Sequence, residues 1–282
     1  MRKFIISDIH GNGNIYNSIM GYLDNISNDY DVALYINGDL IDRGEDSALI
    51  LLDVIKRSKN NNKFKIEYLG GNHEFMMYKF FKDRRNLKIW YHNGGLVTEE
   101  GLYRLLDNDE DKINDVVNYI SNLNIYHKFN ETINNKKIVL VHASCPLVVK
   151  NNCDLTIKDD DSLVFASVWS RELDSNNNYY SVIGHTPVNN KYGYEYNNNY
   201  INIDGGSSCY VSGYRGWDHI PLVEVCSNYL RILTFNNNNE IIYGNYFNGK
   251  DNCLINNRDL DIDRDYLNKN VKIKKIGYDY KR

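Results

Sequence analysis

Short β-branched runs alternate with segments of helical periodicity along this 282-residue chain. Apolar side chains recur on one face of residues 15–26 and 48–55, and more loosely of residues 76–81, as in amphipathic helices. The candidate buried strands are residues 4–6, 32–36, 66–69, 138–141, 181–183, 201–203 and 222–225. Strand, loop and helix repeated in this order predict an α/β layered fold with a largely buried sheet.

Polar residues follow five of these candidate strands, at the point where each strand ends. In layered α/β folds, ligands gather at the loops outside the carboxyl ends of strands, so these residues are candidates for one site. Only one residue separates the first two, and the two-residue period of a strand predicts that they point the same way. In chain order the candidates are Asp8 and His10, Asp39, Asn72 and His73, His142, and His185.

The donor atoms in this set favour a metal centre. Carboxylate, amide and imidazole ligands together suit borderline-hard divalent ions such as manganese or iron. Asp39 carries a carboxylate that can bridge two ions. Each residue alone is ordinary turn or core chemistry, but five clusters in order at strand ends are not expected by chance.

The chain shows no composition break, so residues 1–226 are predicted to form one catalytic domain. Residues 227–282 are predicted to be a C-terminal extension. It contains strand-like runs at 230–235 and 240–243 around an asparagine-rich loop, which is typical of a β-hairpin, and then a polar tail.

Composition excludes several classes of function. A net charge of -4 argues against a nucleic-acid partner, because such binding depends on phosphate neutralisation by Lys and Arg. The basic residues between 269 and 282 are interpreted as a solvated tail. The N-terminal segment lacks the apolar stretch of a signal peptide, and no apolar run is long enough for a membrane helix, so no membrane partner is expected. Five scattered cysteines favour neither a disulfide framework nor structural zinc, which suits a reducing cytoplasm.

Three sequence blocks carry a resemblance to a known family. They read SDIHG at residues 7–11, GDLIDRG at 38–44 and GNHE at 71–74. Together they resemble the signature blocks of the phosphoprotein-phosphatase branch of calcineurin-like metallophosphoesterases. Finer features are similar to the bacteriophage lambda protein phosphatase and its bacterial relatives: EFMM at 74–77, NGG at 93–95, VHA at 141–143, WSRE at 169–172, GHTP at 184–187 and IDGG at 203–206.

The resemblance implies a fold of central mixed β-sheets flanked by helices, with a dinuclear metal site at strand ends. The implied ligands of the first metal are Asp8, His10 and Asp39, and those of the second are Asp39, Asn72, His142 and His185. The implied cofactor is a pair of divalent ions, manganese first, with iron, zinc or magnesium as alternatives. A hydroxide bridging the two ions would attack the phosphate.

The resemblance also implies roles for the remaining motif residues. Arg43 and Arg171, together with Asn72, would bind phosphate oxygens, for which a guanidinium fork is well shaped. His73 would protonate the leaving alkoxide, and Asp42 would orient His73. The implied activity is that of a serine/threonine or dual-specificity protein phosphatase, and the implied partner is a phosphorylated protein or a small phosphomonoester.

Two alternative functions are weighed against this one. A diadenosine tetraphosphate hydrolase of the same superfamily would share the metal ligands, but such enzymes usually have aspartate after the histidine of the third block, where this chain has Glu74. A binding module with a retained metal site is disfavoured because every implied ligand and the implied acid are present.

Two departures from the family pattern affect selectivity more than chemistry. Ser7 stands where the family usually has glycine, which predicts crowding of the first metal loop. Gly205 replaces the usual threonine after Asp204, and the stretch that follows, up to residue 217, is longer than expected.

Overall fold

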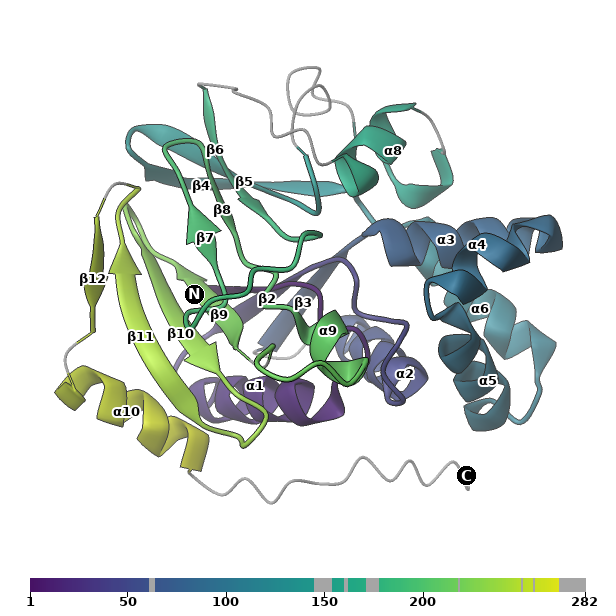
Figure 1. Cartoon of the computed structure of the whole chain (residues 1–282), viewed down its shortest axis with the longest axis horizontal. Coiled ribbons are helices and arrows are strands. Elements are labelled where there is room, and N and C mark those ends of the chain that lie inside the picture. The colour runs from purple at the N-terminus through teal and green to yellow at the C-terminus, as the bar shows by residue number, and fades with distance from the viewer. Residues whose placement is uncertain are drawn as a thin grey trace.

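The structure is a computed structural model, and it describes residues 1–60, 64–144, 154–159, 162–170, 178–217, 219–249, 251–255 and 257–268. Two β-sheets are layered against each other, with helices on the outside and to one side (Figure 1). Both sheets are mixed and flanked by helices, as the family resemblance implied.

The larger sheet has seven strands. Their bounds are β1 (Arg2–Ile6), β2 (Val32–Asn37), β3 (Phe64–Leu69), β9 (Ile220–Val225), β10 (Leu230–Phe235), β11 (Ile241–Phe247) and β12 (Asn252–Leu254). Their order is β12-β11-β10-β9-β1-β2-β3. Strands β1, β2 and β3 are parallel, so their carboxyl ends meet at one edge, whereas β9 to β12 are antiparallel to their neighbours.

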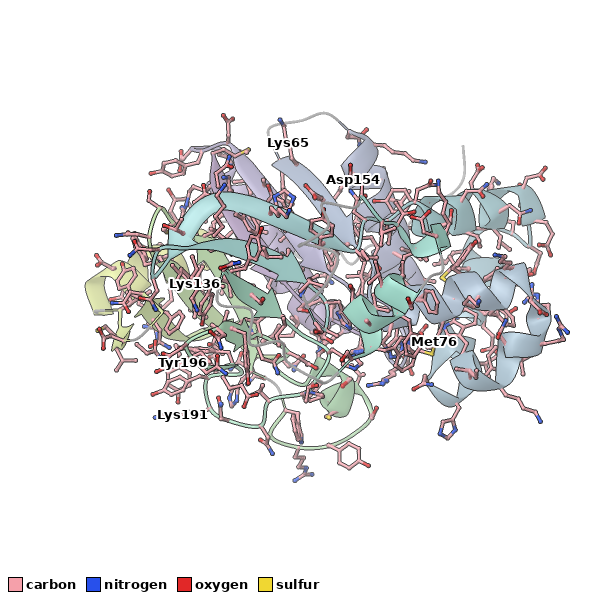
Figure 2. The ribbon with its side chains drawn as sticks, turned by 90° about the horizontal axis from the view of Figure 1, so that it is seen from above. Lys65, Met76, Lys136, Asp154, Lys191 and Tyr196 are labelled. Atoms are coloured by element: carbon pink, nitrogen blue, oxygen red, sulfur yellow. The ribbon has the colours of Figure 1, made fainter. Side chains whose placement is uncertain are left out.

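The smaller sheet has five strands. Their bounds are β4 (Tyr126–Ile133), β5 (Lys136–Val141), β6 (Tyr179–Ile183), β7 (Glu195–Tyr196) and β8 (Tyr200–Asn202). Their order is β4-β5-β6-β8-β7, with β5, β6 and β8 parallel and the two outer strands antiparallel. Figure 2, which looks from above, shows Lys136 and Tyr196 on this part of the molecule and Met76 toward the helices on the other side.

The helices cover the larger sheet and build a lobe beside it (Figure 1). Their bounds are α1 (Gly13–Ile26), α2 (Ser47–Lys59), α3 (Asn72–Lys82), α4 (Leu87–His92), α5 (Gly95–Leu105), α6 (Glu110–Ser121), α8 (Ser162–Trp169), α9 (Ser207–Val211) and α10 (Asn257–Asn268), with short 3₁₀ turns at Arg84–Asn86 and Ile157–Asp159. None of the helices in the described ranges is both long and apolar enough to cross a membrane.

The lobe contains helices that the apolar periodicity did not predict. Helix α4 spans 6 residues and buries only Trp90. Helix α5 begins at Gly95, after Gly94 in the left-handed conformation, and contains a further glycine at 101. Short helices with one or two buried side chains give a weak periodic signal, so their presence depends on packing against α3 and α2 rather than on local sequence.

Two apolar clusters hold the layers together. Alternation along β1 puts Ile5 in the cluster shared by the two sheets, with Ile138 and Val182 of the smaller sheet. Phe4 and Ile6 point the other way, into the cluster that includes the buried faces of α1 and α2. The β1 strand is therefore covered on both faces, which fixes its carboxyl end between the sheets and the helices.

The chain after residue 226 continues the larger sheet. Strands β10 and β11 pair antiparallel, and β10 also pairs with β9. Helix α10 packs beside α1, where Tyr22 donates to Asp263 at 2.8 Å. A domain boundary at residue 226 stays a prediction, and the basic residues from 269 to 282 lie outside the described residues. Of the cysteines, Cys209, Cys226 and Cys253 are free thiols, and Cys145 and Cys153 lie outside the described residues.

Candidate active site

The loops after β1, β2, β3, β5 and β6 converge where the two sheets meet. Backbone hydrogen bonds tie the first two loops together: the Asp8 amide donates to the Gly38 carbonyl at 3.2 Å, and the His10 amide donates to the Asp39 carbonyl at 3.0 Å. The amide of His185, after β6, donates to the Asp8 carboxylate at 3.0 Å. The polar residues predicted at strand ends are thus brought together in one place.

The prediction that strand alternation points Asp8 and His10 the same way is wrong. Strand β1 ends at Ile6, and the two residues lie in a turn with positive φ angles of 54° and 48°. The two-residue period of a strand does not apply there. Asp39, Asp42, Arg43 and His185 also have positive φ, between 50° and 72°. Left-handed backbone, and not strand geometry, aims these side chains at the site.

One group of side chains that could hold a metal ion consists of His10, Asp39 and His73, all of them buried. Nδ1–H of His10 donates to the Ile41 carbonyl at 3.0 Å, and its Nε2 lies 3.5 Å from Oδ2 of Asp39. Burial, reinforced by the neighbouring His73, holds the pKa of His10 well below its usual value. His10 is therefore a neutral imidazole with a free lone pair, which is the form that binds metals.

A second group consists of Asp39, His142 and His185. Nδ1–H of His142 donates to the Asn37 carbonyl at 2.8 Å, so Nε2 faces the site. Oδ1 of Asn72 lies 2.9 Å from Nε2 of His142 and 2.8 Å from Nδ1 of His185. Burial disfavours protonation of His142, but the Asp39 and Asp8 carboxylates outweigh it and raise the pKa of His142 to about 10.

The donor set fits a divalent cation. With its pKa raised to about 10, His142 carries a proton on each ring nitrogen, and it donates from Nδ1 to the Asn37 carbonyl and from Nε2 to the amide oxygen of Asn72. A divalent cation bound between His142 and Asn72 would take the place of the Nε2 proton. The raised pKa of His142 shows the same attraction for positive charge. Asp39 belongs to both groups, as a bridging ligand would.

Asp8 lies at the edge of this arrangement. It is buried but belongs to neither of the two groups. Its carboxylate accepts from the Ser7 hydroxyl and from the His185 amide. Burial and the nearby Asp204 raise its pKa well above the usual range. Its assignment to the first metal stays a prediction.

Glu74 organises the ligand loops, and its role was not predicted. Its carboxylate accepts from the backbone amides of Asp39, Leu40 and Gly71 at 2.8, 3.1 and 2.9 Å, and from the Tyr68 hydroxyl at 2.6 Å. Gly71 is needed for this close approach, because a Cβ there would lie 2.4 Å from Oδ1 of Asp39. Glu74 thereby joins the loop after β2 to the loop after β3.

His73 and Asp42 form a buried pair beside the first group. Nδ1 of His73 lies 2.7 Å from Oδ2 of Asp42. Asp42 also accepts from Nε1 of Trp90 at 2.8 Å and from the Thr98 hydroxyl at 2.6 Å. Burial lowers the pKa of His73, but Asp39 and Asp42 outweigh it, so the net shift is upward. Nη2 of Arg43 lies 3.3 Å from Nε2 of His73.

Two other motif residues are Arg171 and Asp204, and the structure describes only the second. Arg171 lies outside the described residues. Asp204, from the IDGG motif, is buried near the centre, where burial and the Asp39 charge raise its pKa to about 7. Its carboxylate accepts from the Gly206 amide at 2.9 Å.

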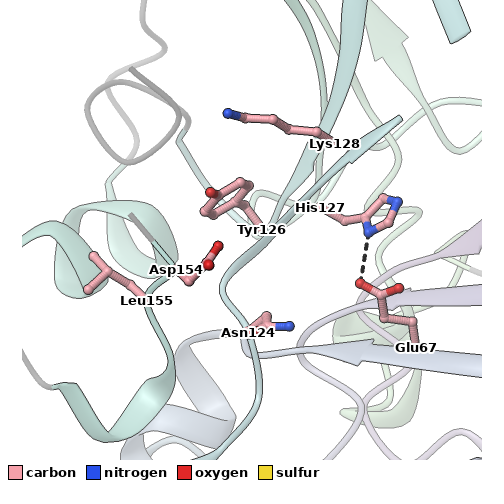
Figure 3. Close-up of a pocket in the computed structure, with 7 residues that line it drawn as sticks. All are labelled: Glu67, Asn124, Tyr126, His127, Lys128, Asp154 and Leu155. Carbon is pink, nitrogen blue, oxygen red and sulfur yellow. Dashed lines mark hydrogen bonds and ion pairs between the residues drawn. The ribbon is translucent and has the colours of Figure 1, made fainter. Parts of the chain in front are cut away.

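Two cavities lie outside the metal-binding groups. One, of about 280 Å³, lies between β3 and β4, where Glu67 accepts from His127 at 2.8 Å (Figure 3). The other, of about 140 Å³, is apolar and lies beside the site between α3, α4 and α8. Trp169 in its wall has its ring 6.2 Å from the ring of His185.

Comparison with known protein families identifies the class. The family model for calcineurin-like phosphoesterases matches residues 1–217, so the chain belongs to this family. It is accordingly a phosphoester hydrolase, and the buried His and Asp groups described above could bind metal. No curated protein matches the chain by sequence.

Several solved structures share the fold. A cold-active protein tyrosine phosphatase of the psychrophile Shewanella sp. has a TM-score of 0.50 and 14% identity, covering 85% of this chain and 78% of that one. A protein serine/threonine phosphatase of Saccharomyces cerevisiae has a TM-score of 0.51 and 16% identity, covering 84% of this chain and 80% of that one. A protein assigned provisionally as a diadenosine tetraphosphatase has a TM-score of 0.45, 16% identity and coverage of 83% and 93%, and supports no argument. At these identities the likenesses concern the fold alone.

Proposed function

We propose that this protein is a metal-dependent phosphomonoesterase that acts on phosphoserine and phosphothreonine in proteins, with phosphotyrosine as a further substrate. The observation that carries the proposal is the His73–Asp42 pair lying directly beside two groups of metal-binding side chains that share Asp39. A phosphate ester bound there would lie next to both a proton donor and a cation-binding cluster.

In this proposal Asp8, His10 and Asp39 hold one divalent ion, and Asp39, Asn72, His142 and His185 hold the other. Manganese is the preferred ion, with iron, zinc or magnesium as alternatives. Such ions supply an activated water for attack and neutralise charge on the phosphate. Support comes from the donor geometry, in which His10 and His142 each give Nδ1–H to a carbonyl and keep Nε2 for a ligand.

Arg43 and His73 have separate roles in this proposal: Arg43 binds the phosphate, and His73 protonates the leaving alkoxide. A guanidinium only donates, so its contact with Nε2 of His73 suits a neutral imidazole. A phosphate dianion is a stronger acceptor and draws Arg43 away. Nε2 of His73 would then be free to take up a proton from solvent and donate it to the leaving alkoxide, while Asp42 holds the ring by Nδ1. Arg171 is the proposed second phosphate ligand.

His73 also belongs to the first metal-binding group, with Nε2 3.8 Å from Oδ2 of Asp39. We assign it to proton transfer because Asp42 binds Nδ1 of the ring and is itself held in place by hydrogen bonds from Trp90 and Thr98. The assignment predicts that removing His73 slows turnover while both metals stay bound.

The substrate class is tested with the purified protein and manganese. Phosphopeptides containing phosphoserine, phosphothreonine or phosphotyrosine are compared with p-nitrophenyl phosphate and diadenosine tetraphosphate, and kcat/KM is measured for each. We expect efficient cleavage of phosphopeptides and poor cleavage of the dinucleotide. A dinucleotide kcat/KM above that of every phosphopeptide would assign the protein to the diadenosine tetraphosphate hydrolases instead.

A further inference from the structure

Ser7 contacts residues of both proposed metal sites. It is buried at 1% exposure, and its hydroxyl donates to Oδ2 of Asp8 at 2.5 Å. The other neighbour of the hydroxyl is the Asn37 carbonyl at 3.2 Å, the same carbonyl that accepts from His142. Ser7 thus lies between Asp8, which is proposed for the first metal, and the Asn37 carbonyl, which orients His142 of the second.

The Ser7 hydroxyl lies in a closely packed part of the site. Gly184 packs against it, and a Cβ at Gly184 would lie 2.2 Å from Oγ of Ser7 and 2.0 Å from Oδ2 of Asp8. The Gly184 amide donates to the His142 carbonyl at 2.8 Å, so this glycine belongs to the packed centre of the site. The predicted crowding of the first loop by Ser7 is thus accommodated by the missing side chain of Gly184.

We propose that Ser7 is a positioning residue that fixes the carboxylate of Asp8 for metal binding. The inference rests on the proposed role of Asp8 as a metal ligand. Among the residues that the structure describes, two donors hold this carboxylate, the Ser7 hydroxyl on Oδ2 and the His185 amide on both oxygens. Without the hydroxyl the carboxylate keeps only the amide and loses its fixed orientation. Groups that orient a metal ligand in this way typically change metal affinity by about 10- to 100-fold when they are removed.

The test is calorimetric titration of chelator-treated protein with Mn²⁺. Ser7→Ala and Ser7→Gly both remove the hydroxyl, and the second installs a residue that needs no extra space. We expect one of the two binding steps to weaken by about 10- to 100-fold and the other to change little. At saturating Mn²⁺, kcat for p-nitrophenyl phosphate recovers most of its wild-type value, since orientation and not chemistry was lost.

Ser18→Ala is the matched control. Ser18 is also a buried serine, and its hydroxyl donates to the Asn14 carbonyl on α1, away from the site. This variant should bind both ions as the wild type does. If both Ser7 variants fold by circular dichroism and bind Mn²⁺ as tightly as the wild type or more tightly, the proposal is overturned. Because Mn²⁺ binding is measured without substrate, a wrong substrate class would leave this result intact.

Discussion

The site has two halves that are built differently. The first half, between Asp8 and His73, comes from the loops after three adjacent parallel strands, and its loops are joined by backbone hydrogen bonds and by Glu74. The second half, His142 and His185, comes from the smaller sheet, and in the described residues its two loops are linked by the Gly184 amide, which donates to the His142 carbonyl.

The second half takes its orientation from the first. The Nδ1 proton of His142 is held by Asn37, at the end of β2, and the His185 amide is held by Asp8. Asn72 faces both imidazoles. Changes in the first half should therefore disturb both metal-binding groups, whereas changes in the second half should disturb one.

The largest effect is expected from Asp39→Asn, because Asp39 belongs to both groups. Loss of the Asp39 charge should weaken the binding of both ions and abolish measurable turnover. Circular dichroism should show that the variant is still folded. The matched control is Asp115→Asn on the exposed face of α6, which should keep wild-type activity. Two tightly bound ions and full activity in Asp39→Asn would rule out the bridging role.

His73→Asn should separate chemistry from metal binding within the first half. We expect kcat for an alkyl phosphate to fall by about 10²- to 10⁴-fold, the usual contribution of a general acid. The loss should be smaller for p-nitrophenyl phosphate, whose leaving group needs little protonation. Metal analysis should still find two ions per chain. Loss of an ion would indicate that His73 is a metal ligand. Equal falls in kcat for the two substrates would contradict its role as general acid.

A comparison of His10→Ala with His185→Ala tests the difference between the halves directly. His10 is buried with a fixed ring, and His185 is partly exposed. We expect His10→Ala to weaken Mn²⁺ binding more than His185→Ala does, and His185→Ala to leave one of the two ions bound with near wild-type affinity. Calorimetric titration measures both. The opposite ranking would contradict the dependence of the second half on the first.

The smallest effect concerns pH. Burial lowers the pKa of His73, and the Asp39 and Asp42 charges more than offset this, so the acid form persists to higher pH than usual. Asp42→Asn removes one of the charges, and the pKa of His73 should fall. The alkaline limb of the kcat profile should then move to lower pH. A profile with an unmoved alkaline limb would mean that another group controls that limb.

Strand positions and the residues at strand ends were predictable because both depend on local sequence. Buried strands read as β-branched runs, and the site residues follow them directly. The supports of the site were not predictable in the same way. Trp90 and Thr98 reach Asp42 from 48 and 56 residues away, out of helices with weak periodicity. Glu74 belongs to the GNHE block, but its three backbone partners come within reach only when the loops after β2 and β3 lie side by side.

The left-handed turns at the site have a consequence for engineering. Holding a non-glycine residue in that conformation costs about 1 kcal/mol or more at each position. Aspartate and histidine are among the side chains found there most often, and they are also the residues that the proposed metal site needs. Glycine at these positions would relieve the strain and remove the donor atoms at once. A screen for melting temperature alone would therefore tend to select glycine substitutions at these positions, and the selected variants would lose activity. Melting temperature and activity must therefore be selected together.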